Sequence, residues 1–211
     1  MKLNRSDLLF NLISPVYGLF YSFQRRHYAK ILEKVKDVFD PTKYHTVLDV
    51  GSGTGALASV LSEHGLHVTG VESSTGMLKV ADRQKENKHV RFLRANALER
   101  LPFEDKSFDV SFASYVAHGL RADERKHMYA EMSRVSRHLV IIHDYNENRS
   151  LITSFVEWLE RGDYFRFIKV AKKEMKDCKK VKTESLAFSS CFSEVKVIDV
   201  DIRASWYIGI P

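Results

Sequence analysis

A glycine-rich turn at residues 51–55 carries the most recognisable chemistry of this chain, and an acid, Asp49, stands two residues before it. The apolar run Val47–Val50 before the turn has strand character, and apolar residues recur at helical spacing over Leu57–Leu61 after it. Because glycine lacks a Cβ, such a chain can turn tightly and a ligand can lie against its backbone. A strand, a glycine turn and a helix in this order bind a cofactor at the carboxyl end of the first strand of an open α/β sheet. The segment therefore predicts a nucleotide-like cofactor.

The same turn fits two classes of cofactor. Read as G-x-G-x-x-G/A, Gly51 to Ala56 matches the dinucleotide fingerprint, and Glu72 lies 21 residues after Gly51, where an acid accepts ribose hydroxyls. That spacing suits both classes. Dinucleotide turns usually carry an apolar residue where Asp49 stands, so Asp49 and the third glycine, Gly55, favour the other class.

Four segments carry a family resemblance in one register: Val47–Gly55, Val68–Leu78, Val90–Ala97 and Leu101–Val110. They resemble the glycine motif, the acid-x-S-x-x-M-L helix start, the adenine loop and the LPF-x-D-x-S-F-D segment of class I S-adenosylmethionine (SAM) methyltransferases. The resemblance covers about residues 44–145. It implies SAM as cofactor. It also implies a Rossmann-like α/β fold, with a seven-stranded, mostly parallel sheet, helices on both faces and an antiparallel last strand.

The resemblance also implies roles for single residues. The backbone of the glycine turn would line the methionine part of SAM, and Glu72 would accept both ribose hydroxyls. Met77 would flank the adenine, while Asn96, where the family usually has Asp, and Ala97 would meet its edge. Asp49 would order the turn or bind the cofactor ammonium. The predicted cofactor-binding set is Asp49, Gly51, Gly53, Gly55, Glu72, Ser73, Met77, Asn96, Ala97 and Ser114.

Methyl transfer from a sulfonium needs alignment, exclusion of water and, for a protonated nucleophile, a general base. No metal is required, and no metal-ligating cluster is predicted. Side chains just past the fourth and fifth strands are the candidates for the base: Ser114, Tyr115, His118, His143, Asp144 and Tyr145. His118 is the predicted catalytic residue because imidazole titrates near neutral pH. The alternative is a loop histidine satisfied by backbone groups.

Residues 1–40 are predicted to form a helical cap, with a short first element, a break at Ser14–Pro15 and a second helix to about Phe39. The uncharged run from Leu8 to Gln24 is short for a membrane span, is interrupted by polar residues and lacks a cleavage site. It is therefore interpreted as part of the cap rather than as a signal or membrane segment.

The stretch Phe10–Tyr17 resembles the start of ubiquinone/menaquinone C-methyltransferases, whose corresponding segment covers the pocket. The aromatic residues of the cap either pack on the sheet or face that pocket. In the second case Tyr17 and Tyr21, four residues apart on one helix face, would contact the substrate. His143 is a further predicted substrate contact.

Length and composition predict one domain over residues 1–211, because 211 residues with 44% hydrophobic content can bury one full core. Its expected parts are the cap 1–40, a cofactor-binding core 44–145, a helical insertion 148–185 and a C-terminal strand pair 193–211. The two cysteines, Cys178 and Cys191, form neither a disulfide framework nor a zinc spacing. They favour a reducing compartment, and a cytoplasmic location is expected.

The net charge of +6 is concentrated in residues 161–182, which hold nine basic and three acidic residues. Apolar residues interleave with them, so an amphipathic helix is predicted there. One interpretation is that this segment is a solvated face. The alternatives are that it binds an anionic substrate, an anionic membrane surface or RNA.

Ala113–Val116, after the fourth strand, lacks the Asn/Asp-Pro-Pro-aromatic segment of enzymes that methylate base amines, which disfavours that reaction. The sequence therefore predicts a SAM-dependent methyltransferase for a small-molecule acceptor, with an anionic or lipid-like quinone precursor as one option. An RNA or protein methyltransferase that uses the basic segment, and a non-catalytic SAM-binding module, are the alternatives. Binding to nucleic acid is disfavoured but is kept as an alternative. The sequence does not indicate an oligomeric state.

Overall fold

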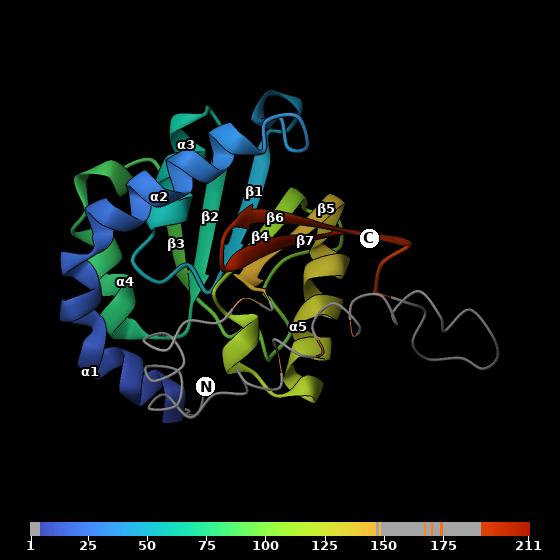
Figure 1. Cartoon of the computed structure of the whole chain (residues 1–211). Helices are drawn as coiled ribbons and strands as arrows, with labels where there is room; N and C mark the ends of the chain where they lie inside the picture. Colours follow the sequence, from blue (N-terminus) through green and yellow to red (C-terminus); the bar gives the residue numbers. More distant parts are fainter. Residues whose placement is uncertain (1–4, 147, 149–166, 168–169, 171–173, 175–190) are drawn as a thin grey trace. The chain divides into compact units, whose positions relative to one another are not determined.

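The apolar runs of the sequence form the strands of a seven-stranded sheet. A computed structural model describes residues 5–146, 148, 167, 170, 174 and 191–211 (Figure 1). The strand order is β3-β2-β1-β4-β5-β7-β6, and helices flank the strands. The predicted fold class, a Rossmann-like, mostly parallel sheet with an antiparallel last strand, is confirmed.

The chain divides into two compact units, residues 1–102 and 103–211. The first unit contains α1 (Arg5–Leu19), α2 (Tyr21–Lys34), η1 (Pro41–Lys43), β1 (Thr46–Val50), α3 (Ala56–Glu63), β2 (His67–Glu72), α4 (Thr75–Asp82), η2 (Lys85–Asn87) and β3 (Arg91–Arg94). Strand β2 pairs in parallel with both β1 and β3. Val47, Leu48 and Val50 are fully buried, as expected for a strand covered on both faces.

The predicted break at Ser14–Pro15 is wrong, because α1 runs through Pro15 and the chain bends only at Phe20. Proline removes the N–H that would donate to the carbonyl of Asn11, one helical turn earlier. The Ser14 hydroxyl donates to that carbonyl instead, at 3.1 Å. A side-chain donor thus replaces the lost backbone donor, which lets the helix continue.

The second cap helix is shorter than predicted. Helix α2 ends at Lys34 rather than near Phe39, and the backbone N–H groups of Val38 and Phe39 both bond to the carbonyl of Val35. The ring of Phe39 is buried and stacks on Tyr44 at 5.4 Å between ring centroids. The turn after α2 therefore places the ring of Phe39 in the core.

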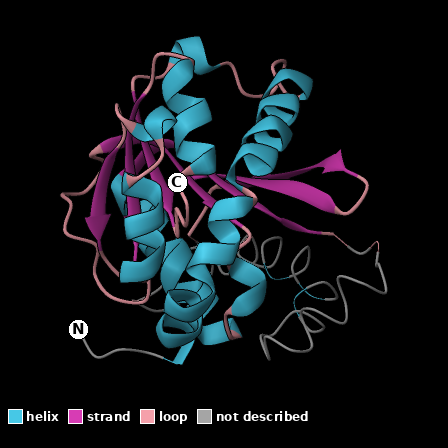
Figure 2. Cartoon of the chain, turned by 90° about the vertical axis from the view of Figure 1, so that its left-hand side faces the viewer, coloured by secondary structure: helices cyan, strands magenta, loops and turns pink. Residues whose placement is uncertain are grey.

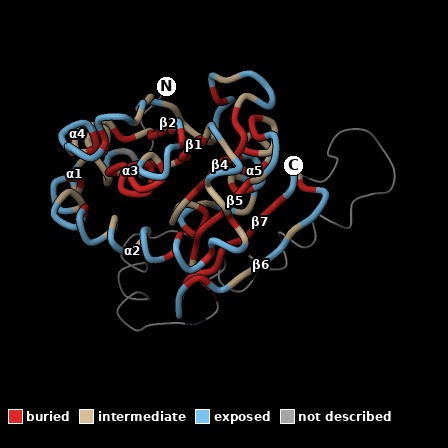
Figure 3. Tube along the Cα trace, turned by 90° about the horizontal axis from the view of Figure 1, so that it is seen from above, coloured by how far each residue is buried: buried red, intermediate tan, exposed pale blue. Residues whose placement is uncertain are grey.

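The second unit contains β4 (Phe108–Ser114), η3 (Ala117–Gly119), α5 (Ala122–Val135), β5 (Ser136–Tyr145), β6 (Glu194–Asp201) and β7 (Ala204–Ile210). Strand β4 is parallel to β5, whereas β7 runs antiparallel to both β5 and β6. Figure 2 shows β6 and β7 as long strands joined by a tight turn, which confirms the predicted C-terminal strand pair. Strands β5 and β7 are buried along most of their length (Figure 3).

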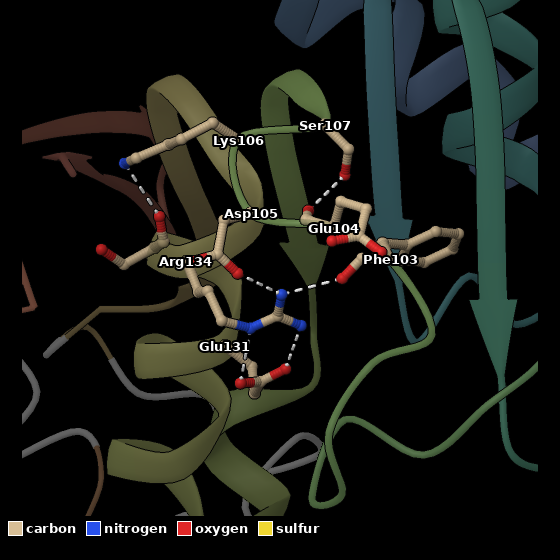
Figure 4. A network of polar contacts seen from close by, with 8 residues as sticks. Phe103, Glu104, Asp105, Lys106, Ser107, Glu131 and Arg134 are labelled. Carbon is tan, nitrogen blue, oxygen red and sulfur yellow. Dashed lines mark hydrogen bonds and ion pairs between the residues drawn. The ribbon is translucent and has the colours of Figure 1, made fainter.

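The loop before β4 is held by one arginine of α5. Arg134 donates to the carbonyl of Phe103 and to Asp105, both at 2.8 Å, and forms two bonds to Glu131 (Figure 4). Lys106 has a φ of 53°, and its amine donates to the carbonyl of Ser133. Asp105 thus orients the guanidinium of Arg134, and the same guanidinium binds the loop backbone at Phe103.

Most of the predicted insertion 148–185, including the basic segment 161–182, lies outside the described residues. Of its described members, Phe167 is buried and its ring lies 5.5 Å from the guanidinium carbon of Arg125. Glu174 forms two bonds of 2.9 and 3.0 Å with the same guanidinium. Buried Arg125 therefore pairs with two side chains of the insertion.

Candidate functional site

The glycine turn of the first unit is tightly packed at one end and open in the middle. Gly51, Gly53 and Gly55 have φ values of 69°, 53° and 79°, in the left-handed region that favours glycine. A Cβ on Gly55 would lie 2.5 Å from the amide of Asn87 and 2.7 Å from the ring of Phe92. Nothing lies within 4 Å of a Cβ built on Gly53. A ligand can therefore approach the backbone at Gly53.

Glu72, at the end of β2, connects this turn to α4. Its carboxylate accepts from the N–H of Gly53 at 3.0 Å and from the N–H of Ser74 at 2.8 Å, and the hydroxyl of Ser73 lies 3.4 Å away. An ionised carboxylate can accept about four hydrogen bonds, so this bridging role is compatible with binding ribose hydroxyls as well. The structure thus adds a positioning role to the role that the sequence predicted.

Asp49 is the unusual charge of this region. It is buried at the end of β1, and its Oδ2 has no hydrogen-bond partner among the described residues. Burial and the nearby charge of Glu72 raise the pKa of Asp49 to about 7, against a backbone hydrogen bond from Ala58 that lowers it. A buried carboxylate with an unsatisfied oxygen is costly, so a cationic or hydrogen-donating ligand group would stabilise it.

The remaining predicted cofactor contacts are placed as follows. Met77 is buried in the first turn of α4, and its N–H bonds to the capping hydroxyl of Ser74 at 3.1 Å. Asn96 and Ala97 are half-buried after β3, and the Oδ1 of Asn96 accepts from the N–H of Leu98 at 3.0 Å. The amide NH₂ of Asn96 would thus be the group that donates to an adenine edge. The cofactor roles of these residues stay predictions.

Asn11 of α1 is a contact that the sequence analysis did not find. Its Oδ1 accepts from the hydroxyls of Ser74 and Thr75 at 2.9 and 3.2 Å and from the N–H of Gly76 at 2.7 Å. A Cβ on Gly76 would lie 2.8 Å from the Cα of Asn11, so glycine is required there. Since Ser74 also bonds to Glu72, Asn11 links the N-terminal helix to the carboxylate that holds the glycine turn. No local signal reveals this contact, because 63 residues separate Asn11 from Ser74.

The prediction that Tyr17 and Tyr21 share a helix face is wrong, because the bend at Phe20 places them on α1 and α2. Tyr21 is buried, and its hydroxyl donates to Asn87 at 3.0 Å. Tyr17 is half-buried, with its ring edge-on to Phe10. Tyr21 therefore has a structural contact of its own, and the substrate role of the two tyrosines stays a prediction.

In the second unit the structure pairs two of the predicted catalytic candidates. The Nδ1 of His118, in η3, lies 2.8 Å from the Oδ1 of Asp144, and the backbone N–H of His118 donates to the other carboxylate oxygen at 3.1 Å. Asp144 is fully buried and His118 nearly so. With Nδ1 held by the carboxylate, the ring would exchange a proton at Nε2. This arrangement orients His118 as a general base requires.

The other candidates pack around this pair. His143 lies 3.0 Å from the hydroxyl of Ser114 through Nδ1, and the ring of Tyr115 lies 4.7 Å from the ring of His143. The ring of Tyr145 lies 4.9 Å from that of His118 and 5.1 Å from that of Tyr115. Tyr115 has a φ of 54°, which is uncommon for a residue with a side chain and recurs at functional sites. Ser114, predicted to bind cofactor, belongs to this cluster of the second unit.

Comparison with known protein families gives a match over part of the chain. Residues 48–141 match the family model described as a methyltransferase domain. This region is therefore similar to a methyltransferase domain. It contains the glycine turn, Glu72 and His118, and it agrees with the resemblance drawn from the sequence motifs.

Similar sequences are found among curated proteins. The chain is 33% identical over 134 residues to a demethylmenaquinone methyltransferase of Renibacterium salmoninarum, covering 61% of this chain and 53% of that protein. It is 36% identical over 124 residues to an uncharacterized methyltransferase of Bacillus subtilis, covering 56% of this chain and 47% of that protein. The chain thus spans about half the length of these curated relatives.

Solved structures extend the likeness to the whole chain. A candidate S-adenosyl-L-methionine-dependent methyltransferase of Methanococcus maripaludis has a TM-score of 0.69 and 15% identity, over 99% of this chain and 96% of that chain. At this identity the likeness shows the fold alone.

Proposed function

We propose that this chain is a SAM-dependent methyltransferase that acts on a small-molecule acceptor. The observation that carries the proposal is the buried Oδ2 of Asp49, which has no hydrogen-bond partner in the described structure, next to an open glycine turn tied to Glu72. SAM carries a cationic sulfonium, which activates the methyl group, and an ammonium. These residues fit such a cofactor: the Gly53 backbone allows close approach, Asp49 supplies negative charge and Glu72 accepts hydroxyls.

A dinucleotide fits the same residues less well. It would bring an anionic pyrophosphate to the helix N-terminus that follows the glycine turn. The carboxylate of Asp49 is buried at the end of the preceding strand and would repel that anion. The same carboxylate attracts a cationic group, so the local charge favours SAM.

For the acceptor, we propose a small aromatic or lipid-like molecule. Support comes from the relative named demethylmenaquinone methyltransferase and from the cluster of Tyr115, Tyr145 and His143, whose rings could pack against a planar acceptor. In this proposal His118, oriented by Asp144, removes the proton of the acceptor nucleophile. A base helps only if that nucleophile carries a proton, as a phenol or a hydroquinone does.

Calorimetry of the purified chain with SAM, S-adenosylhomocysteine and NAD tests the cofactor class. We expect micromolar binding of both sulfur compounds, a range typical of cofactor sites, and no binding of NAD. Binding of NAD alone would identify residues 51–56 as a dinucleotide turn and contradict the proposal. SAM binding without turnover on any acceptor would indicate that the chain is a non-catalytic SAM-binding module.

Replacing Glu72 by alanine should weaken SAM binding by about 1.5–3 kcal/mol, or about 10- to 150-fold, because bonds to a charged acceptor are lost. The variant also releases the N–H groups of Gly53 and Ser74, so glutamine, which keeps one acceptor oxygen, should lose less. Glu99→Ala, at an exposed position after β3, is the matched control. An unchanged SAM dissociation constant in Glu72→Ala would exclude the ribose role.

A further inference from the structure

The N-terminal helices expose an unusual amount of apolar surface. Six of the eight large hydrophobic side chains that are exposed in the described structure lie between residues 8 and 23. We call them the cap stripe: Leu8, Leu12, Val16, Leu19, Phe20 and Phe23. Leu12 is 78% and Leu19 is 83% exposed. No helix in the described part of the chain is long and apolar enough to cross a membrane.

Four members of the cap stripe form one face of α1, opposite the face that packs on α4, and the other two, Phe20 and Phe23, lie at the bend and in α2. At 100° per residue, Leu8, Leu12, Val16 and Leu19 fall within about 80° of arc. Ser14, which is buried, and Asn11, which bonds to α4, lie on the other side. Both faces of α1 are therefore apolar or buried, and the first unit covers only one of them (Figures 1 and 3).

The stripe continues into a basic face on α2. Beyond Phe23, the outward positions are Arg26, Lys30 and Lys34, while Ile31 and Leu32 are buried on the inner side. Helix α2 carries four basic residues and one acid, Glu33. Exposed apolar side chains can enter a membrane interface, and basic residues beside them attract anionic lipid headgroups.

We propose that the cap stripe, with Arg26 and Lys30, binds an anionic membrane surface, with α1 lying along it. A second copy of this chain fits the same face less well. A two-fold interface that included Arg26 and Lys30 would bring the basic faces of two α2 helices toward each other, and like charges in an interface oppose association. The proposal does not depend on methyl transfer, so it can fail or succeed independently of the proposed function.

Co-sedimentation of the full chain with lipid vesicles tests the proposal. We expect binding to vesicles of phosphatidylcholine mixed with phosphatidylglycerol, and much weaker binding to phosphatidylcholine alone. The variant Leu12→Ser with Leu19→Ser should weaken binding at least about tenfold, because two exposed apolar side chains no longer enter the interface. Ile202→Ser, at an equally exposed apolar position in the β6–β7 turn, should have no effect.

A charge variant tests whether Arg26 and Lys30 attract the anionic membrane surface. Arg26→Gln with Lys30→Gln should weaken binding to the anionic vesicles about tenfold and leave the weak binding to phosphatidylcholine unchanged. Lys126→Gln with Lys196→Gln, at exposed positions of α5 and β6, is the matched control. All these positions are exposed, and circular dichroism confirms that each variant folds. If the leucine variant does not fold, the charge variant still decides.

Three results would overturn the proposal. The first is no binding of the wild-type chain to anionic vesicles, and the second is binding that both double variants leave unchanged. The third is a dimer in analytical ultracentrifugation that Leu12→Ser with Leu19→Ser converts to monomer while vesicles are not bound. That third result would assign the cap stripe to a second copy of the chain.

Discussion

Replacing His118 by alanine should lower kcat by about 10²- to 10⁴-fold, the range for loss of a general base, while SAM binds as before. The expectation rests on the 2.8 Å contact between His118 Nδ1 and Asp144, which orients the imidazole. The measurement is methyl transfer from labelled SAM to the best acceptor from a screen of phenols and hydroquinones, with calorimetry for SAM. His127→Ala, at an exposed position of α5, is the matched control.

Asp144 should act through His118 rather than on the acceptor. Asp144→Asn should also lower kcat by orders of magnitude, because an amide can donate to Nδ1 and stabilise the wrong tautomer. A purely structural role would lower the melting temperature without changing the pH profile of the remaining activity. Turnover of His118→Ala equal to that of wild type would exclude His118 as the base.

Replacing Asp49 by asparagine should weaken SAM binding and remove its dependence on pH near 7. Burial raises the pKa of Asp49 to about 7, so the cofactor-free chain holds a proton there below neutral pH. A cationic cofactor favours the ionised form, so wild-type affinity should rise by up to about tenfold per pH unit below 7 and level off above it. Calorimetry from pH 6 to 8 measures this. A flat wild-type profile would contradict the role of Asp49 as the partner of a cofactor cation.

Asp49 should also make folding stability depend on pH, in the opposite sense to SAM binding. A higher pH should strengthen SAM binding but lower the stability of the cofactor-free chain. The folded pKa of Asp49, about 7, lies above the ordinary value of 3.8, so the folded chain binds more protons than the unfolded chain between these values. Stability without cofactor should therefore fall as pH rises through this window, by an amount on the order of 4 kcal/mol in total. Asp49→Asn should lack this loss. At pH 8 it should melt at a higher temperature than wild type while it binds SAM more weakly.

Local sequence was sufficient to predict the elements that carry the candidate cofactor site. Val47–Val50 is a buried strand because a continuous apolar run suits a strand covered on both faces, and left-handed φ values at the three following glycines need residues without a Cβ. The position of Glu72 at the end of the next strand follows from the same strand-turn-helix pattern. Such features depend on neighbouring residues, so the amino-acid sequence determines them by itself.

Contacts between distant segments were decided only by the tertiary structure. The parallel register that pairs Ser114 with His143 brings residues after β4 next to residues after β5, and so joins His118 to Asp144. Helix α1 continues through Pro15 because Ser14 replaces a lost donor, and Asn11 caps α4 from 63 residues away. Composition and spacing indicate which side chains are candidates for catalysis or binding. Which of them meet depends on strand register and helix packing, since those bring together groups that are remote along the chain.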